Sequence, residues 1–140
     1  MEALALLEFE SIARGVLAID RLLKRAPVSL LRCGTIHPGR YLALCGGSVA
    51  SVEEAYRAAD AAGDASDGVL LPDPHPGLLA AVAAGESAAG ADFGPEGNGD
   101  LLVLECASSP TLLRLLDGIL KAVPVTLPVL RLADDLGGRA

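Results

Sequence analysis

Apolar and polar residues alternate along positions 1–84 in segments that predict short strands and helices in turn. Residues 3–9 are apolar and bounded by charge, which is typical of a buried strand. A helix is expected next, with Ser11 as its N-cap, and Pro27 ends it. Apolar residues three and four positions apart predict the core-facing stripe of this helix: Ile12, Val16, Ile19, Leu22 and Leu23.

A hairpin is predicted after this helix. Residues 28–36 and 40–45 are expected to form two strands, because both are rich in residues that favour strands. The dipeptide Pro38-Gly39 between them favours a turn. Gly46-Gly47 is expected to end the second strand.

The next segments predict a second helix, a last strand and a short third helix. Ser48 is the expected N-cap of the second helix, with an inner stripe of Val49, Val52, Ala55 and Ala59. Residues 69–71 predict the strand, and residues 77–84 the short helix. The order βαββαβα predicts an α/β (α+β) fold of the split-βαβ, ferredoxin-like kind, with helices on an antiparallel sheet.

The C-terminal part of the chain repeats the N-terminal part. Residues 85–99 are rich in Gly, Ala and Ser, which predicts a flexible linker. Beyond it, a shift of 97 positions, which places Glu105 on Glu8, also aligns Ser108 with Ser11, Asp117 with Asp20, Lys121 with Lys24 and Pro124 with Pro27. We therefore expect a complete domain at 1–84 and the N-terminal half of a second copy, βαβ, at 100–140. This half has no returning strand of its own, so we expect either a truncated chain or a fragment that leans on its neighbour.

Composition argues against several classes of protein. The chain contains no apolar run long enough to span a membrane, and its N-terminus has no basic region typical of a secretory signal, so we expect a cytoplasmic protein. A net charge of −7 disfavours nucleic acid as a partner. The three cysteines are far apart in sequence, which indicates neither a zinc knuckle nor a disulfide framework.

Catalysis is not expected. Only His37 and His75 could act as a general base near neutral pH, and neither lies near a nucleophile motif.

Four stretches of this sequence resemble the bacterial microcompartment (BMC) shell domain: residues 8–15, 20–28, 35–42 and 46–55. The resemblance is continuous over residues 3–84 and weaker over 100–140. It is greatest to the tandem class, in which two fused shell domains form a subunit and three subunits form a pseudohexameric tile. The propanediol-utilisation branch of that class is the most similar, with the second domain truncated here.

The resemblance implies contacts at the edge of a tile for Lys24 and for the turn Asp73-Pro74-His75. Asp73 stands where the family usually has arginine, so an anion replaces a cation at that contact. From spacing alone, Lys24 is also explained as a solvated lysine at the C-terminal end of a helix.

The resemblance also implies that one loop surrounds a central pore, formed by Thr35, Ile36, His37, Pro38, Gly39 and Arg40, with Asp134 and Asp135 as its counterpart in the second copy. His37 replaces the cysteine of a cluster-bearing relative, so we expect no iron–sulfur cluster and no other cofactor. A ring of His37 side chains could bind a divalent metal ion or an anion, or change charge with pH, or His37 could be a water-exposed loop residue. The two aspartates could make the pore acidic or simply be solvated.

These observations predict a structural shell protein and not an enzyme. It is expected to associate with itself, as a homotrimer or as a hexamer if the second copy is not used, and with other shell proteins in a microcompartment shell. Its pore would pass small polar metabolites. The alternative is a ferredoxin-like trimeric regulatory module that binds a metabolite or a metal ion.

Overall fold

The structure, a computed structural model, describes residues 1–85, 100–133, 137 and 139–140. Its elements follow in the order β1 (Ala3–Phe9), α1 (Ile12–Arg25), β2 (Ser29–Ile36), β3 (Arg40–Gly47), α2 (Val49–Gly63), β4 (Asp67–Leu71), α3 (Pro76–Ala84) and α4 (Ser109–Ala122). The order βαββαβα predicted for the first copy is confirmed. Among the described residues, no helix has both the length and the apolar character needed to span a bilayer.

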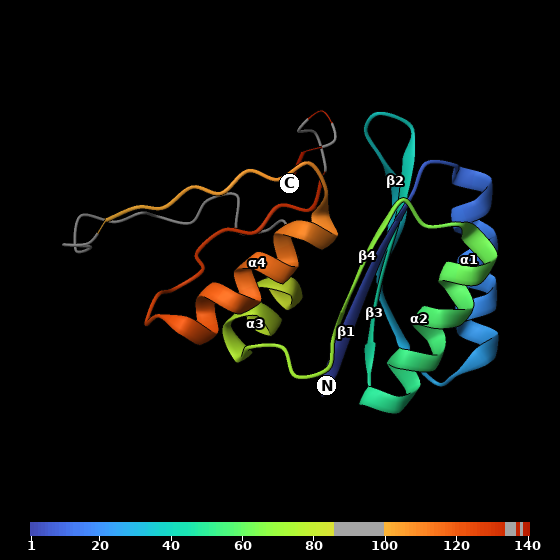
Figure 1. The fold of residues 1–140 in the computed structure, drawn as a ribbon, viewed down its shortest axis with the longest axis horizontal. Coiled ribbons are helices and arrows are strands. Elements are labelled where there is room, and N and C mark those ends of the chain that lie inside the picture. Colours follow the sequence, from blue (N-terminus) through green and yellow to red (C-terminus); the bar gives the residue numbers. More distant parts are fainter. Residues whose placement is uncertain (86–99, 134–136, 138) are drawn as a thin grey trace.

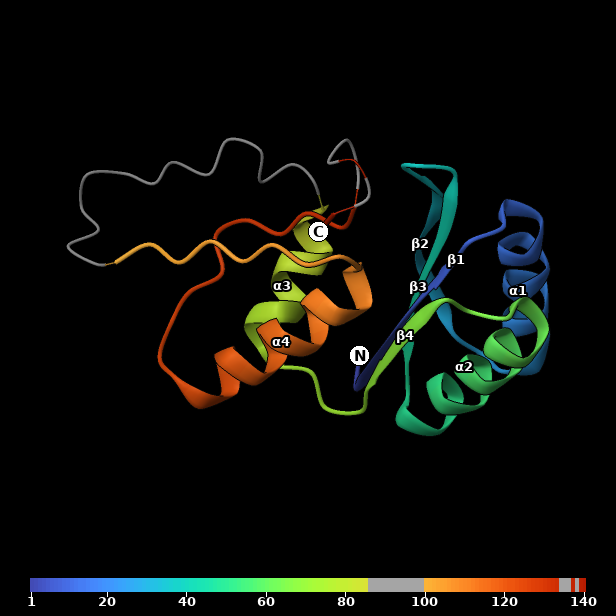
Figure 2. The ribbon, with the colours of Figure 1, turned by 45° about the horizontal axis from the view of Figure 1, so that its top comes forward.

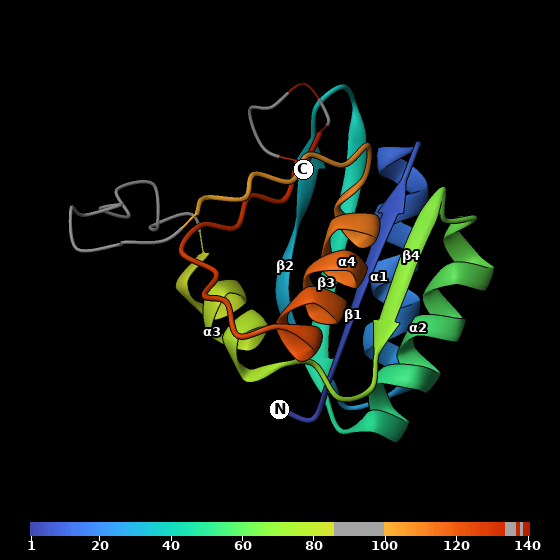
Figure 3. The same ribbon diagram turned by 60° about the vertical axis from the view of Figure 1, so that its left-hand side comes forward.

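The four strands form one antiparallel sheet in the order β2-β3-β1-β4. Helices α1 and α2 cover one face of the sheet, and α3 and α4 lie on the other (Figures 1 and 3). The two central strands are β1, which precedes α1, and β3, which precedes α2. Strands β2 and β4 form the two edges of the sheet. This topology is the split-βαβ arrangement predicted from the sequence.

Local signals in the sequence fix the starts of the helices. The Ser11 hydroxyl accepts a hydrogen bond from the Arg14 amide (3.4 Å), and the Ser48 hydroxyl accepts one from the Ser51 amide (3.3 Å). Each satisfies a donor that the first turn of a helix leaves unpaired. Helix α1 ends at Arg25, two residues before Pro27, as predicted.

The prediction of which face of α1 meets the sheet was correct for Leu22 and Ile19 only. The residues buried in α1 are Gly15, Ala18 and Leu22. A Cβ atom at Gly15 would lie 2.6 Å from Cδ1 of Tyr41, so the absence of a side chain lets the helix approach the sheet closely. Three members of the predicted stripe are instead exposed: Ile12, Val16 and Leu23.

Two smaller predictions also need correction. Strand β3 does not end at Cys45 but continues through Gly46 and Gly47, which pair with Leu4 and Ala3 of β1. In α2, the stripe of Val52, Ala55 and Ala59 is buried as predicted, whereas Val49 is exposed at the first turn of the helix.

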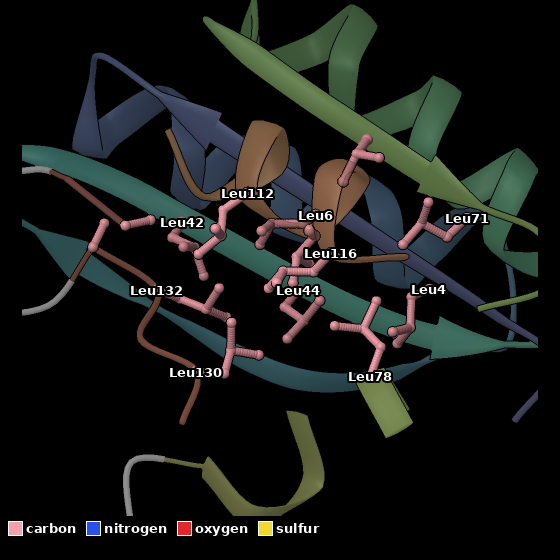
Figure 4. Close-up of a cluster of buried hydrophobic side chains, with 14 of the residues drawn as sticks. Leu4, Leu6, Leu42, Leu44, Leu71, Leu78, Leu112, Leu116, Leu130 and Leu132 are labelled. Carbon is pink, nitrogen blue, oxygen red and sulfur yellow. The ribbon is translucent and has the colours of Figure 1, made fainter. Parts of the chain in front are cut away.

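The sheet separates two hydrophobic cores. The core on the α1–α2 side is built largely from small residues such as Ala3, Ala5 and Ala55. The opposite core is rich in leucine and lies between the sheet, α3, α4 and the segment that follows α4 (Figures 2 and 4). Its buried leucines include Leu4, Leu6, Leu42, Leu44, Leu71, Leu78, Leu112, Leu113, Leu116, Leu120, Leu130 and Leu132.

Helix α4 is the helix expected in the second copy. Ser108 caps it by accepting a hydrogen bond from the Thr111 amide (3.3 Å), as Ser11 does in α1. The flanking segments 101–106 and 125–132, expected as strands, are not assigned to a sheet. A strand requires a row of hydrogen bonds to a neighbour, whereas among the described residues of these segments Cys106 and Ala140 exchange one pair of backbone hydrogen bonds (2.7 and 2.9 Å). The second copy therefore buries its helix on the sheet of the first copy.

Candidate functional site

The β2–β3 hairpin forms an exposed loop at one end of the sheet (Figure 1). Gly39 has a φ of +77°, in the left-handed region that favours glycine, and the His37–Pro38 peptide bond is cis. The exposed residues of the predicted pore loop are Thr35, His37, Pro38 and Gly39. Ile36 is buried, so its side chain belongs to the core and not to the loop surface.

Potential metal ligands are few at this loop. Within the described ranges, no three His, Cys, Asp or Glu side chains gather closely enough to hold a metal ion. His37 is the only one of these residue types in the 35–40 loop. Asp134 and Asp135, predicted as its acidic counterpart, lie outside the described residues.

Arg40 points away from the loop and into the protein. Its side chain is 14% exposed, and its Nη1 atom lies 2.8 Å from Oε2 of the fully buried Glu8. The other carboxylate oxygen of Glu8 accepts a hydrogen bond from the backbone amide of Ser109, at the start of α4 (2.8 Å). A carboxylate is favourable at a helix N-terminus, where backbone amides are unpaired and the helix dipole is positive. Glu8 thus connects the hairpin to the C-terminal helix.

Asp67 makes a second polar connection between the sheet and α4. Its Oδ2 atom accepts hydrogen bonds from the hydroxyls of Ser108 and Thr111, the latter at 3.0 Å. Partial burial favours the neutral form of Asp67, but these hydrogen bonds outweigh that effect and lower the pKa of the carboxyl below its ordinary value of 3.8. Nearby, Nη2 of Arg114 donates to the Gly68 carbonyl oxygen (2.8 Å).

The predicted edge turn also contacts α4. The backbone amide of His75 donates to Oδ1 of Asp117 (2.7 Å), and Nζ of Lys121 lies 2.7 Å from the other oxygen of that carboxylate. Lys121 also donates to the carbonyl oxygen of Asp73. Pro74 is buried, whereas the Asp73 side chain is exposed. Of the predicted turn residues, Asp73 and His75 therefore remain accessible at the surface.

Lys24 lies at the C-terminal end of α1 and is exposed. Its Nζ atom lies 2.7 Å from Oδ1 of Asp20, one helical turn earlier. Lys121 and Asp117, the counterparts of Lys24 and Asp20 in the repeat, are the residues that contact the edge turn. The structure thus places the edge turn of the first repeat unit in contact with Lys121 of the second.

Sequence analysis missed the polar residues that join the two units. Glu8, Asp67 and Asp117 were not proposed as site residues. The sequence signal that could have identified Glu8 is a charged residue inside an otherwise apolar segment. This charged residue recurs in the repeat. Glu8 pairs with Arg40, and its counterpart Glu105 pairs with Arg139 (2.5 Å).

Known proteins resemble this chain along almost its whole length. The family model for the BMC domain matches residues 3–72. The bacterial microcompartment shell protein PduT of Citrobacter freundii is 33% identical over 140 residues, which are 99% of this chain and 72% of that protein. The crystal structure of a microcompartment protein from Desulfitobacterium hafniense superposes with a TM-score of 0.76 at 31% identity and covers 99% of this chain and 74% of that one. This chain therefore belongs to the family of bacterial microcompartment shell proteins that carry the BMC domain.

Proposed function

We propose that this protein is a structural subunit of a microcompartment shell and has no catalytic role. The observation that carries the proposal is the continuous match to a shell protein over 99% of the chain, which includes the C-terminal repeat. The imidazole Nδ1 of His75 accepts a hydrogen bond from the Gly77 amide (3.1 Å) and so caps α3. His75 therefore has a structural task, which supports a non-catalytic reading.

The chain is organised as one complete shell domain at residues 1–84, a linker at 85–99 and part of a second unit at 100–140. Two features support this division. Helix α3 ends at Ala84, and α4 reproduces the capping and the charged pattern of α1 after a 97-residue shift. The helix of the second unit covers one face of the sheet of the first unit.

We propose that copies of the chain associate as a homotrimer of pseudohexameric outline, which forms a tile in a cytoplasmic shell together with other shell proteins. The 35–40 loop would surround the central opening and expose Thr35, His37 and Gly39 to small polar metabolites. A ring of imidazoles at position 37 lacks the thiolates that hold an iron–sulfur cluster, which supports the absence of a cluster there.

Edge contacts between tiles would involve Lys24 together with Asp73 and His75. The support is the position of Lys121, the counterpart of Lys24, which lies against the edge turn. A lysine at the end of a helix has three donors on a flexible stem, so it can contact carbonyl oxygens of an adjacent tile.

Negative-stain microscopy and native mass spectrometry of the purified chain test this function. The expected result is trimers that form flat discs, which join into sheets at higher concentration. A strictly monomeric mass at all concentrations would refute the proposal.

A pair of variants tests the edge contact separately. Lys24→Ala should abolish sheets and keep discs, whereas Arg57→Ala should keep both, because Arg57 forms a comparable i,i+4 pair with Glu53 on α2. Calorimetry with metal ions and nucleotides tests the regulatory alternative, which requires saturable binding to a protein that does not form sheets.

A further inference from the structure

Strand β4 forms one edge of the sheet, where its backbone could pair with a further strand. It runs antiparallel to β1, with Gly68 opposite Leu7 and Leu70 opposite Ala5. Along an antiparallel strand, successive residues direct their backbone groups alternately to one side and to the other. An edge strand therefore presents half of its N–H and C=O groups to any strand that approaches, and proteins protect such edges in several ways.

Side chains occupy both backbone groups of Gly68. Its amide donates to Oδ1 of the preceding Asp67 (2.8 Å), and its carbonyl oxygen accepts from Nη2 of Arg114 on α4 (2.8 Å). Because these groups pair with side chains and not with β1, they face the open side of the edge. Leu70, two residues later, faces the same side, and Pro72, which follows in the same alternation, has no N–H to offer.

Helix α4 also holds the Asp67 side chain in place, and it lies beside β4 (Figure 3). The hydroxyls of Ser108 and Thr111 donate to Oδ2 of Asp67, which leaves Oδ1 directed at the Gly68 amide. Asp67, Thr111 and Arg114 are called the edge clamp below. Two of its three residues come from α4, so the protection of this edge depends on the docking of that helix.

The repeat indicates that the edge clamp is not needed to build the helix. The 97-residue shift places Thr111 on Arg14 and Arg114 on Leu17. Helix α1 lacks both clamp side chains, yet it has the same length of 14 residues and the same kind of serine cap. The two clamp residues of α4 are thus explained by their contacts with β4.

A larger residue at position 68 could not protect the edge in place of the clamp. A Cβ atom at Gly68 would lie 2.5 Å from the hydroxyl of Tyr56 on α2, so this position requires glycine. Glycine has no side chain to shield its own backbone from an approaching strand. The hydrogen bonds from neighbouring side chains supply that shielding.

We propose that α4 prevents β4 from pairing with β4 of a second copy of this chain. With the edge clamp open, the two strands would pair antiparallel, with Gly68 of each copy opposite Leu70 of the other. The sequence of β4 favours this partner, because Val69, Leu70 and Leu71 are apolar and its one charge, on Asp67, is held by α4. The closed clamp thus restricts association between copies to other surfaces. The proposal does not depend on the role of the protein in a shell.

The first experiment measures strand binding with a fluorescent peptide that spans residues 66–72. Arg114→Ala removes the donor to the Gly68 carbonyl and should bind the peptide about tenfold more tightly than the wild type, the factor expected from one hydrogen bond of a charged donor. Arg114→Lys keeps a charged donor and should restore the wild-type affinity. Arg14→Ala is the matched control, since Arg14 is an exposed helical arginine that pairs with Asp64. Equal peptide binding by Arg114→Ala and Arg14→Ala would overturn the proposal.

The second experiment separates strand pairing from general exposure of the core. A peptide of the same sequence, methylated at the backbone nitrogens of Gly68 and Leu70, cannot donate the hydrogen bonds of the pair and should not bind Arg114→Ala. Binding that survives this methylation would come from exposed apolar surface, as in a partly unfolded variant, and would refute the proposal. In the intact chain, infrared spectroscopy should show intermolecular antiparallel sheet earlier during incubation for Arg114→Ala than for Arg14→Ala.

Discussion

Replacement of Glu8 by glutamine is expected to lower the free energy of unfolding more than replacement of any exposed charged residue does. Glutamine keeps the size of the side chain, but its NH₂ group faces a donor, either the guanidinium of Arg40 or the amide of Ser109, each 2.8 Å from a carboxylate oxygen. Removing one partner of a buried ion pair costs about 3–5 kcal/mol. Arg40 retains some solvent contact and a further interaction, so we expect about 3 kcal/mol for Glu8→Gln.

Urea unfolding followed by circular dichroism measures this effect. All variants must be compared at one protomer concentration, because association adds to apparent stability. Glu53→Gln is the matched control, since Glu53 forms an exposed pair with Arg57 and such pairs contribute less than about 1 kcal/mol. Equal unfolding midpoints for the Glu8 and Glu53 variants would show that the buried carboxylate does not hold α4 on the sheet.

Three further predictions follow from the described contacts. Leu113→Ala should lower the free energy of unfolding by about 2–5 kcal/mol, since Leu113 is buried, whereas the exposed Leu115→Ala should lower it by less than about 1 kcal/mol; urea unfolding measures both. The pKa of the Asp67 carboxyl is lower in the folded protein than in the unfolded chain. Its contribution to stability is therefore present above about pH 4 and is lost as pH falls through the folded pKa. Asp67→Asn should flatten the fall in the urea unfolding midpoint between pH 5 and 3. Burial raises the pKa of the Cys45 thiol to about 11, so alkylation at pH 8 followed by mass spectrometry should modify the exposed Cys33 quickly and Cys45 only after unfolding.

Local signals in the sequence predicted the order of the elements correctly. Capping residues such as Ser11 and Ser48 act within one helical turn, and the Pro38-Gly39 turn acts within a few residues. The inward face of α1 could not be predicted in this way. Periodicity identifies an apolar stripe, but α1 meets its own sheet through Gly15, Ala18 and Leu22 and leaves Ile12, Val16 and Leu23 exposed. When two surfaces of a helix are apolar, periodicity does not decide which one meets the sheet.

The location of the candidate loop followed from the sequence, but the direction of its side chains did not. The inward position of Arg40 depends on Glu8, a residue of another strand. The role of Glu8 depends in turn on the Ser109 amide, 101 residues further along the chain. Such long-range contacts are decided by how the second unit packs on the first, which no short motif encodes.

The docking of α4 makes its contact with the sheet intramolecular. A contact within one polypeptide does not weaken when the protein is diluted, whereas a contact between separate chains does. A chain on its own therefore keeps this face of the sheet covered, with Leu113 buried.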